Sequence, residues 1–108
     1  MIPDLGAIKW IKIRGYRPWP GIVASLKQVP AVSRANVMRA KVPGSKLMFT
    51  FGDHQWHWAP PQKLYDWKGA QHDRYMPPAH GPQGPKLFKN ALLEAEAAYL
   101  NPKLPLPQ

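Results

Sequence analysis

One short stretch decides the fold: Gly15-Tyr16-Arg17-Pro18-Trp19-Pro20, which lies between a basic strand-like segment and an apolar one. A proline ring fixes φ at Pro18 and Pro20 and pushes the residue before it toward extended geometry. The stretch is therefore a stiff arch that presents two aromatic side chains, Tyr16 and Trp19, three residues apart. Two interpretations of Trp19 stay open, because it could plug one end of a small β core or join Tyr16 in a recognition surface.

Length and composition limit the chain to one small domain. With 108 residues it can bury only part of its surface in a single core. The absence of cysteine excludes disulfides and thiolate metal sites and points to a reducing compartment. No apolar run approaches the ~20 residues that span a bilayer, and no signal-peptide segment follows the start. We therefore expect a soluble intracellular protein that has no membrane partner.

The charge is strongly basic and unevenly distributed. Fifteen Lys and Arg against six Asp and Glu give a net charge of +9 and a pI near 10.1. In residues 1–50, Asp4 is the one acidic residue. Such an excess predicts a polyanionic partner, and binding to duplex DNA would be non-specific in sequence and would fall steeply with salt. The candidate DNA contacts are Lys9, Lys12, Arg14, Arg17, Arg39, Lys41 and Lys46.

Alternating and β-branched residues predict a small sheet. The predicted strands cover residues 7–14, 21–26, 47–51 and 55–59, followed by a 3₁₀ turn and a last short strand within 62–67. The first two strands would pair antiparallel on either side of the arch. If Phe49 and Phe51 face the core, Thr50 faces the opposite side. The residues assigned to the core are Trp10, Phe49, Phe51 and Trp58, with Leu64, Tyr65 and Trp67 as further candidates.

The remaining segments predict little further sheet. Residues 27–46 hold two prolines and no sustained period, which predicts a long connection with about one helical turn. Residues 68–84 are rich in Pro, Gly, His and Gln, so we expect a strap without regular structure or chemistry of its own. Residues 85–100 carry apolar side chains at helical spacing and predict an amphipathic helix. The residues expected to pack this helix against the sheet are Phe88, Leu92 and Tyr99.

The sequence offers no candidate residues for catalysis or for metal binding. His54 and His57 lie three apart in a predicted strand, which sends side chains to opposite faces, so we interpret them as surface or turn histidines. No glycine elbow or phosphate loop is present. Glu94 and Glu96 are two apart on a helix and point away from each other. We therefore expect no enzymatic activity, no cofactor and no bound metal.

The arch and its surroundings resemble the opening of a PWWP domain. The run from Leu5 to Gly21 carries Arg17-Pro18-Trp19-Pro20 at the tetrapeptide that names the family. A second match is Phe51-Gly52-Asp53, followed by Trp58 six residues after the glycine. The long loop and the last helix look most like the second PWWP domain of nuclear-receptor-binding SET-domain histone methyltransferases.

The resemblance implies a mainly β fold with a C-terminal α segment: a five-stranded PWWP/Tudor-like β-barrel of the Royal type packed on a helix. The implied divisions are a barrel over residues 1–67, a Pro/Gly-rich linker strap over 68–84, the C-terminal helix of the same domain over 85–100, and a flexible tail over 101–108. A monomeric chromatin-binding module within a larger nuclear protein is also implied.

The same resemblance implies an aromatic cage for methyl-lysine. Tyr16 and Trp19 match two of its walls, and aromatic faces attract a methylammonium group through cation–π contact. The third wall of the family falls at Thr50, which has no π face. Asp53 is either a carboxylate that faces the ammonium group or only a turn former. The residues that could complete the cage are Trp56, a residue of the long loop, and Ile13 as an apolar flank.

The implied partners are the methylated histone H3 tail, with the lysine-36 mark favoured, and nucleosomal DNA in the nucleus. Two other functions stay open. A nucleic-acid-binding module with a non-functional cage would bind DNA with little preference for methylated peptide. A protein-interaction scaffold would bind a partner through the helix or the proline-rich tail, without marked salt dependence.

Overall fold

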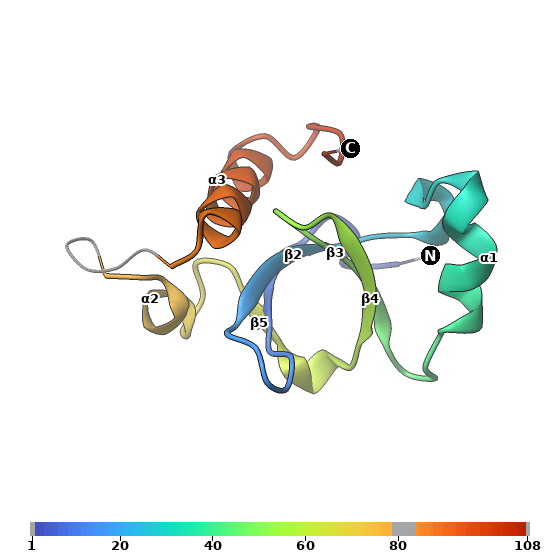
Figure 1. Ribbon diagram of the computed structural model, residues 1–108, viewed down its shortest axis with the longest axis horizontal. Helices are drawn as coiled ribbons and strands as arrows, with labels where there is room; N and C mark the ends of the chain where they lie inside the picture. The colour runs from blue at the N-terminus through green and yellow to red at the C-terminus, as the bar shows by residue number, and fades with distance from the viewer. Residues whose placement is uncertain (1, 79–83, 108) are drawn as a thin grey trace.

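The computed structural model describes residues 2–78 and 84–107. Strands and helices follow in the order β1 (Ile8–Ile11), β2 (Trp19–Val23), η1 (Leu26–Gln28), α1 (Ala31–Arg39), β3 (Lys46–Thr50), β4 (Gln55–Ala59), η2 (Pro61–Lys63), β5 (Leu64–Asp66), α2 (His72–Tyr75) and α3 (Lys86–Leu100). Figure 1 shows the strands curling into a barrel, with α1 on one side and α2 and α3 on the other. No helix of this described part of the chain is long and apolar enough to cross a membrane.

The five strands form one antiparallel sheet in the order β4-β3-β2-β1-β5. This confirms the predicted fold class, a five-stranded antiparallel sheet with C-terminal helical structure. β2 begins at Trp19, two residues before the predicted start, so the end of the arch belongs to the sheet. Pro20 lacks an N–H, but its extended backbone suits a strand, and its carbonyl accepts a hydrogen bond from the Phe51 N–H at 3.1 Å.

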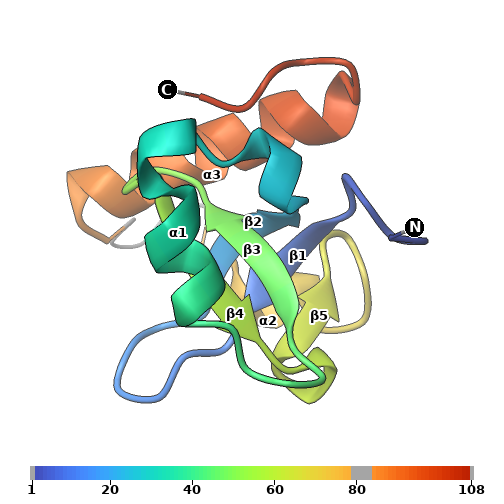
Figure 2. The same cartoon turned by 90° about the vertical axis from the view of Figure 1, so that its right-hand side faces the viewer.

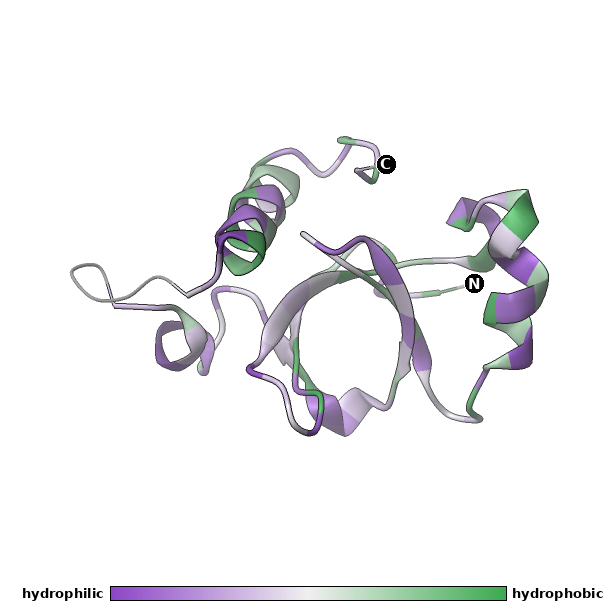
Figure 3. Cartoon of the chain, viewed as in Figure 1, coloured by the Kyte–Doolittle hydropathy of each residue, from purple (hydrophilic) through white to green (hydrophobic). Residues whose placement is uncertain are grey.

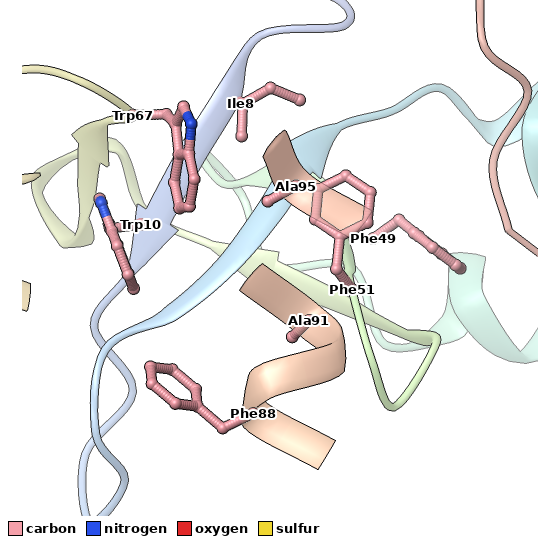
Figure 4. Close-up of a cluster of buried hydrophobic side chains, with 8 residues drawn as sticks. All are labelled: Ile8, Trp10, Phe49, Phe51, Trp67, Phe88, Ala91 and Ala95. Atoms are coloured by element: carbon pink, nitrogen blue, oxygen red, sulfur yellow. The ribbon is translucent and has the colours of Figure 1, made fainter. Parts of the chain in front are cut away.

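Two apolar clusters lie on opposite faces of the sheet, as the two-residue period of a strand requires. One lies between the sheet and α3, and Figure 4 shows its side chains. It consists of Ile8, Trp10, Phe49, Phe51, Trp67, Phe88, Ala91 and Ala95. The other consists of Ile11, Val23, Met48 and Ala59. The predicted burial of Trp10, Phe49 and Phe51 is therefore confirmed.

Two aromatic residues differ from the predicted packing. Trp58 is only partly buried, because its indole N–H reaches outward and donates to the Val37 carbonyl of α1 at 2.8 Å. Tyr99, predicted to pack α3 against the sheet, is 45% exposed, and its ring lies near the Lys68 ammonium group. The other residues predicted to pack α3 behave as expected, with Phe88 buried and Leu92 packed against the main cluster.

The segment 27–46 holds more helix than predicted. α1 spans nine residues and none of them is buried, so no apolar stripe marked it in the sequence. Figure 3 shows hydrophobic and hydrophilic residues mixed around this helix, and Figure 2 shows it lying in front of β3. Polar contacts hold it in place. The Arg34 guanidinium donates to the carbonyls of Leu26 and Val29, and Trp58 donates to Val37.

The predicted strap 68–84 also contains regular structure where it is described, and its residues 79–83, including Pro82, lie outside the described residues. The short helix α2 places His72 in a buried position beside the barrel. The Trp10 indole N–H and the Lys68 backbone N–H both donate to Nδ1 of His72, at 3.1 and 2.9 Å. An acceptor on His72 therefore anchors the segment, and a count of Pro and Gly could not reveal it.

The C-terminal tail packs onto the domain. Leu106 lies against the main cluster, and Leu104 to Pro107 form one side of a small groove beside Ile22 and α3. The expectation for residues 101–108 is a flexible tail. That flexibility stays a prediction, and Leu106, which lies between two prolines, is the leucine of this segment that contacts the cluster.

Candidate functional site

The four predicted cage residues meet in one pocket of about 420 Å³. Its lining residues are Ile13, Tyr16, Trp19, Thr50, Asp53, His57, Pro85 and Leu87. They come from the arch, from β3 and the turn after it, from β4, and from the start of α3. The pocket is thus assembled from three parts of the chain that are distant in sequence.

Trp19 forms a fixed wall of this pocket. Its indole N–H donates to the Phe51 carbonyl at 2.7 Å, and its ring packs on Phe88 at 5.2 Å between centroids. One side of Trp19 therefore belongs to the core while the side chain also lines the pocket. Its role in recognition stays a prediction.

Tyr16 forms a second, freely exposed wall. It follows Gly15, whose φ of +85° is readily adopted only by glycine, and its backbone N–H donates to the Ile13 carbonyl at 3.0 Å. The side chain is 74% exposed. Most of the Tyr16 ring is therefore open to solvent beside the pocket.

Thr50 and Asp53 form a polar wall. Thr50 is 1% exposed, and its hydroxyl donates to the Asp53 carboxylate and accepts the Gln55 backbone N–H at 3.3 Å. Asp53 is at once a residue of the tight turn and part of the pocket lining. The hydrogen bond from the Thr50 hydroxyl thus links this carboxylate to the end of β3.

Three lining residues were not predicted: His57, Pro85 and Leu87. The register of β3 and β4 pairs Met48 with His57 and Thr50 with Gln55, so His57 lies on the same face as Thr50. That placement follows from the pairing of β3 with β4. The alternating residues of these two strands could therefore have predicted it. Pro85 and Leu87 depend on how α3 returns to the arch, which no local pattern encodes.

Trp56 does not complete the cage, because it faces the main core cluster. Its ring packs on Phe49 at 5.0 Å, on the opposite face from Thr50. Residues of the segment 27–46 do not line the pocket either. Of the candidates suggested for closing it, Ile13 is the one found there.

A side chain of α3 holds the turn that carries Asp53. The Glu94 carboxylate accepts the Gly52 N–H at 2.8 Å and lies 3.0 Å from Nε2 of His54. Gly52 has φ +79°, and a Cβ there would lie 2.8 Å from both the Ala91 Cβ and the Leu87 carbonyl oxygen. Glycine is therefore required at this close approach of the turn to α3. Within the described residues, no group of three His, Asp or Glu side chains could hold a metal ion.

The predicted DNA contacts are not equally available. Lys9 forms an ion pair with Asp66 and its side chain is 19% exposed, while Lys46 pairs with Asp4 at 3.1 Å. Lys12 and Arg14 are exposed and make no ion pair with any described residue. The others make lighter contacts: Arg17 over the Phe88 ring, Lys41 near the Trp58 ring, and Arg39 with the Asn36 side chain.

One cationic side chain joins this surface without having been predicted. The Lys63 carbonyl accepts the Lys12 backbone N–H at 2.9 Å, so η2 lies beside the end of β1. We define the basic end as Lys12, Arg14 and Lys63. Because Lys63 lies far from Lys12 in the sequence, no local pattern predicted that the two residues would be neighbours.

The barrel, the arch at the start of β2 and the closing helix define a PWWP domain. The PWWP family matches residues 6–100, and the chain belongs to this family. PWWP domains are chromatin-associated reader modules that bind histones and DNA and are not enzymes, and they are typically nuclear.

Solved structures give the same result. The solution structure of the second PWWP domain of WHSC1L1 protein is 26% identical, with a TM-score of 0.69 over 96% of this chain and 89% of that chain. The crystal structure of WHSC1L1-PWWP2 is 24% identical, with a TM-score of 0.53 over 92% and 86%. A PWWP domain from Schizosaccharomyces pombe shares the fold at 14% identity, with a TM-score of 0.65 over 90% and 87%. The predicted similarity to a second PWWP domain of this kind is thereby confirmed.

Proposed function

We propose that this chain is a chromatin reader that binds methyl-lysine of histone H3, with the lysine-36 mark favoured, and contacts nucleosomal DNA through its basic surface. The observation that carries the proposal is the convergence of Tyr16, Trp19, Thr50 and Asp53 on one pocket of about 420 Å³. Two aromatic faces and a carboxylate suit a methylammonium cation, which makes few hydrogen bonds. The module would act in the nucleus as a monomeric part of a larger protein.

Peptide binding alone is expected to be weak. Each aromatic wall contributes ~0.5–2 kcal/mol, so two walls give an affinity in the millimolar range after the costs of ordering. DNA contacts from Lys12, Arg14 and Arg17 would raise the effective concentration of the histone tail near the pocket. A nucleosome should therefore bind far better than either peptide or DNA alone.

The test compares methylated with unmethylated nucleosomes at two salt concentrations. Tyr16→Ala should remove most of the preference for methylated nucleosomes, because it deletes an exposed wall of the pocket with little effect on folding. Tyr99→Ala, which removes a partly exposed tyrosine outside the pocket, is the matched control and should keep the preference. Trp19→Ala should abolish it, with thermal unfolding used to check that the domain remains folded.

Each alternative predicts a different result. If wild type and Tyr16→Ala bind both nucleosomes equally and affinity falls with salt, the chain is a DNA-binding module with a non-functional cage. Binding that does not change with salt would instead favour a protein-interaction scaffold.

A further inference from the structure

We infer that a second cavity, between α2 and α3, binds a protein segment in which an acidic residue is followed by a leucine. The cavity has a volume of about 370 Å³ and shares no lining residue with the pocket around Tyr16 and Trp19. Its lining residues are Trp67, Lys68, His72, Met76, Lys89, Leu92, Leu93 and Glu96. The inference therefore goes beyond the methyl-lysine site and can be tested apart from it.

The imidazole of His72 is held in one orientation beside this cavity. The residue is 8% exposed, and its Nδ1 accepts hydrogen bonds from the Trp10 indole N–H and the Lys68 backbone N–H. The ring also packs edge to face on Trp67, with 4.5 Å between centroids. Burial lowers the pKa of His72, so the ring is neutral near neutral pH. Because Nδ1 is an acceptor, the one proton of the neutral ring is on Nε2.

The Nε2–H of His72 is a donor without a partner. Among the described residues none accepts a hydrogen bond from it, and none of their fully buried side-chain nitrogens lacks a partner. Nε2 therefore reaches the surface of the cavity that His72 lines. A ligand that brings an acceptor to this place pairs a donor that is otherwise largely removed from water.

The charges around the cavity favour an anion as that acceptor. Lys89 forms no ion pair with any described residue, while Lys68 pairs with Glu96 at 3.1 Å. Both oxygens of Glu96 are already bonded, because the Trp67 indole N–H donates to Oε1 and Lys68 donates to Oε2. Two ammonium groups thus face one carboxylate that is already paired. A carboxylate of the ligand can accept the His72 N–H and lie near these cations.

The apolar part of the cavity sets the second requirement. Leu93 is 70% exposed, and the half-buried side chains of Met76 and Leu92 line the same cavity. A leucine of a bound segment removes apolar surface of all three from water. A segment with a carboxylate alone would leave Leu93 in water, and one with a leucine alone would leave the His72 N–H unpaired. An acidic residue followed by a leucine satisfies both.

The test is an NMR titration of the full chain with a terminally blocked peptide of sequence GDLLG, compared with GNLLG, which lacks the negative charge. We expect GDLLG to bind about tenfold more tightly, as the loss of one charge-assisted hydrogen bond implies. It should shift the signals of Met76, Leu92 and Leu93. Lys89→Ala should weaken binding of GDLLG several-fold. Lys86→Ala removes a cation of the same helix outside the cavity and should not.

Two further variants test the apolar wall and the donor. Leu93→Ala should weaken binding of GDLLG, whereas Leu100→Ala, at an equally exposed leucine of α3 outside the cavity, should leave it unchanged. His72→Asn keeps an acceptor close to the position of Nδ1 but has no donor at the position of Nε2. The difference in affinity between GDLLG and GNLLG should therefore decrease, with thermal unfolding used to check that the variant is folded.

Three results would overturn the inference. The wild-type chain could bind neither peptide, or bind both equally, which would exclude recognition of a carboxylate. Shifts confined to the basic end would show that the net charge of the domain alone attracts the peptide. Tyr16→Ala should leave binding of GDLLG unchanged, so failure of this cavity and failure of the methyl-lysine site are told apart.

Discussion

At the scale of single residues, the Thr50 hydroxyl and the Asp53 carboxylate together form the polar side of the pocket. The sequence alone indicates that Thr50 stands at a family position for an aromatic wall and leaves Asp53 as either turn former or ligand. The structure places both in the pocket and joins them by a hydrogen bond. That bond depends on the shape of the turn between β3 and β4, which residue types do not specify.

Replacing Thr50 with Phe should strengthen the binding of methylated peptide. The ring would enter the pocket as a third aromatic face and add ~0.5–2 kcal/mol of cation–π attraction, while Asp53 would no longer be anchored. We expect trimethyl peptide to bind several-fold more tightly to this variant than to the wild-type chain in an NMR titration. Thr50→Val, which removes the hydroxyl without adding a ring, is the control. A Thr50→Phe variant that binds methylated peptide no more tightly than wild type would contradict a missing third wall.

The basic side chains differ in their availability to DNA, because some of them form ion pairs and others do not. The sequence does not show this difference. Replacing Lys12 and Arg14 together with Ala should weaken binding to duplex DNA. It should also reduce the slope of log K against log salt by roughly 0.9 for each phosphate that is no longer neutralised. Replacing Lys9 with Ala removes a cation already paired with Asp66, so its effect should be small. A salt slope that stays the same in the double variant would exclude these residues from the DNA-binding surface.

At the scale of elements, the sequence predicted the strands and helices in which buried residues recur at a regular spacing. The strands alternate because one face or both meet a cluster, and α3 shows a stripe because Phe88, Ala91 and Ala95 face the sheet. α1 buries none of its residues and α2 is one turn long, so neither leaves a pattern. Their positions are set instead by polar contacts from Arg34, Trp58 and His72.

The contact of α3 with the turn should affect both stability and binding. Glu94→Ala leaves the Gly52 N–H without its acceptor in a partly buried place, which should cost about 1–3 kcal/mol of unfolding free energy. Affinity for methylated peptide should fall more than the decrease in folded protein explains, because Asp53 lies in the loosened turn. Urea denaturation and an NMR titration measure the two effects. Leu93→Ala, on the exposed side of α3, is the control. Full affinity in Glu94→Ala would rule out control of the pocket by α3.

At the scale of the whole molecule, His72 makes stability depend on pH. Burial, and then the nearby charge of Lys68, lower the pKa of His72 from its ordinary value of 6.5, while Asp73 and Glu96 act in the opposite direction. The unfolded chain therefore binds this proton more readily than the folded chain. The stabilisation is complete above pH 6.5 and decreases as the pH falls below that value toward the lowered pKa.

This dependence can be measured by urea denaturation across that pH range. His72→Asn keeps an acceptor close to the position of Nδ1 but does not titrate, so the decrease in stability below pH 6.5 should become smaller. Comparison with the wild type over the same range isolates this group from the acidic residues, which titrate at lower pH. A variant with an unchanged pH profile would show that another group causes the decrease.

The pocket is also a product of the complete chain, because its walls come from residues 13–19, 50–57 and 85–87. No fragment that ends before α3 can contain it, and a chain in which α3 no longer packs presents only an exposed tyrosine and a loose turn. Ligand affinity therefore depends on whether α3 is packed against the rest of the domain. A substitution far from the pocket that weakens the attachment of α3 will resemble a binding-site mutation in every binding assay, and only a parallel measurement of unfolding can tell the two apart.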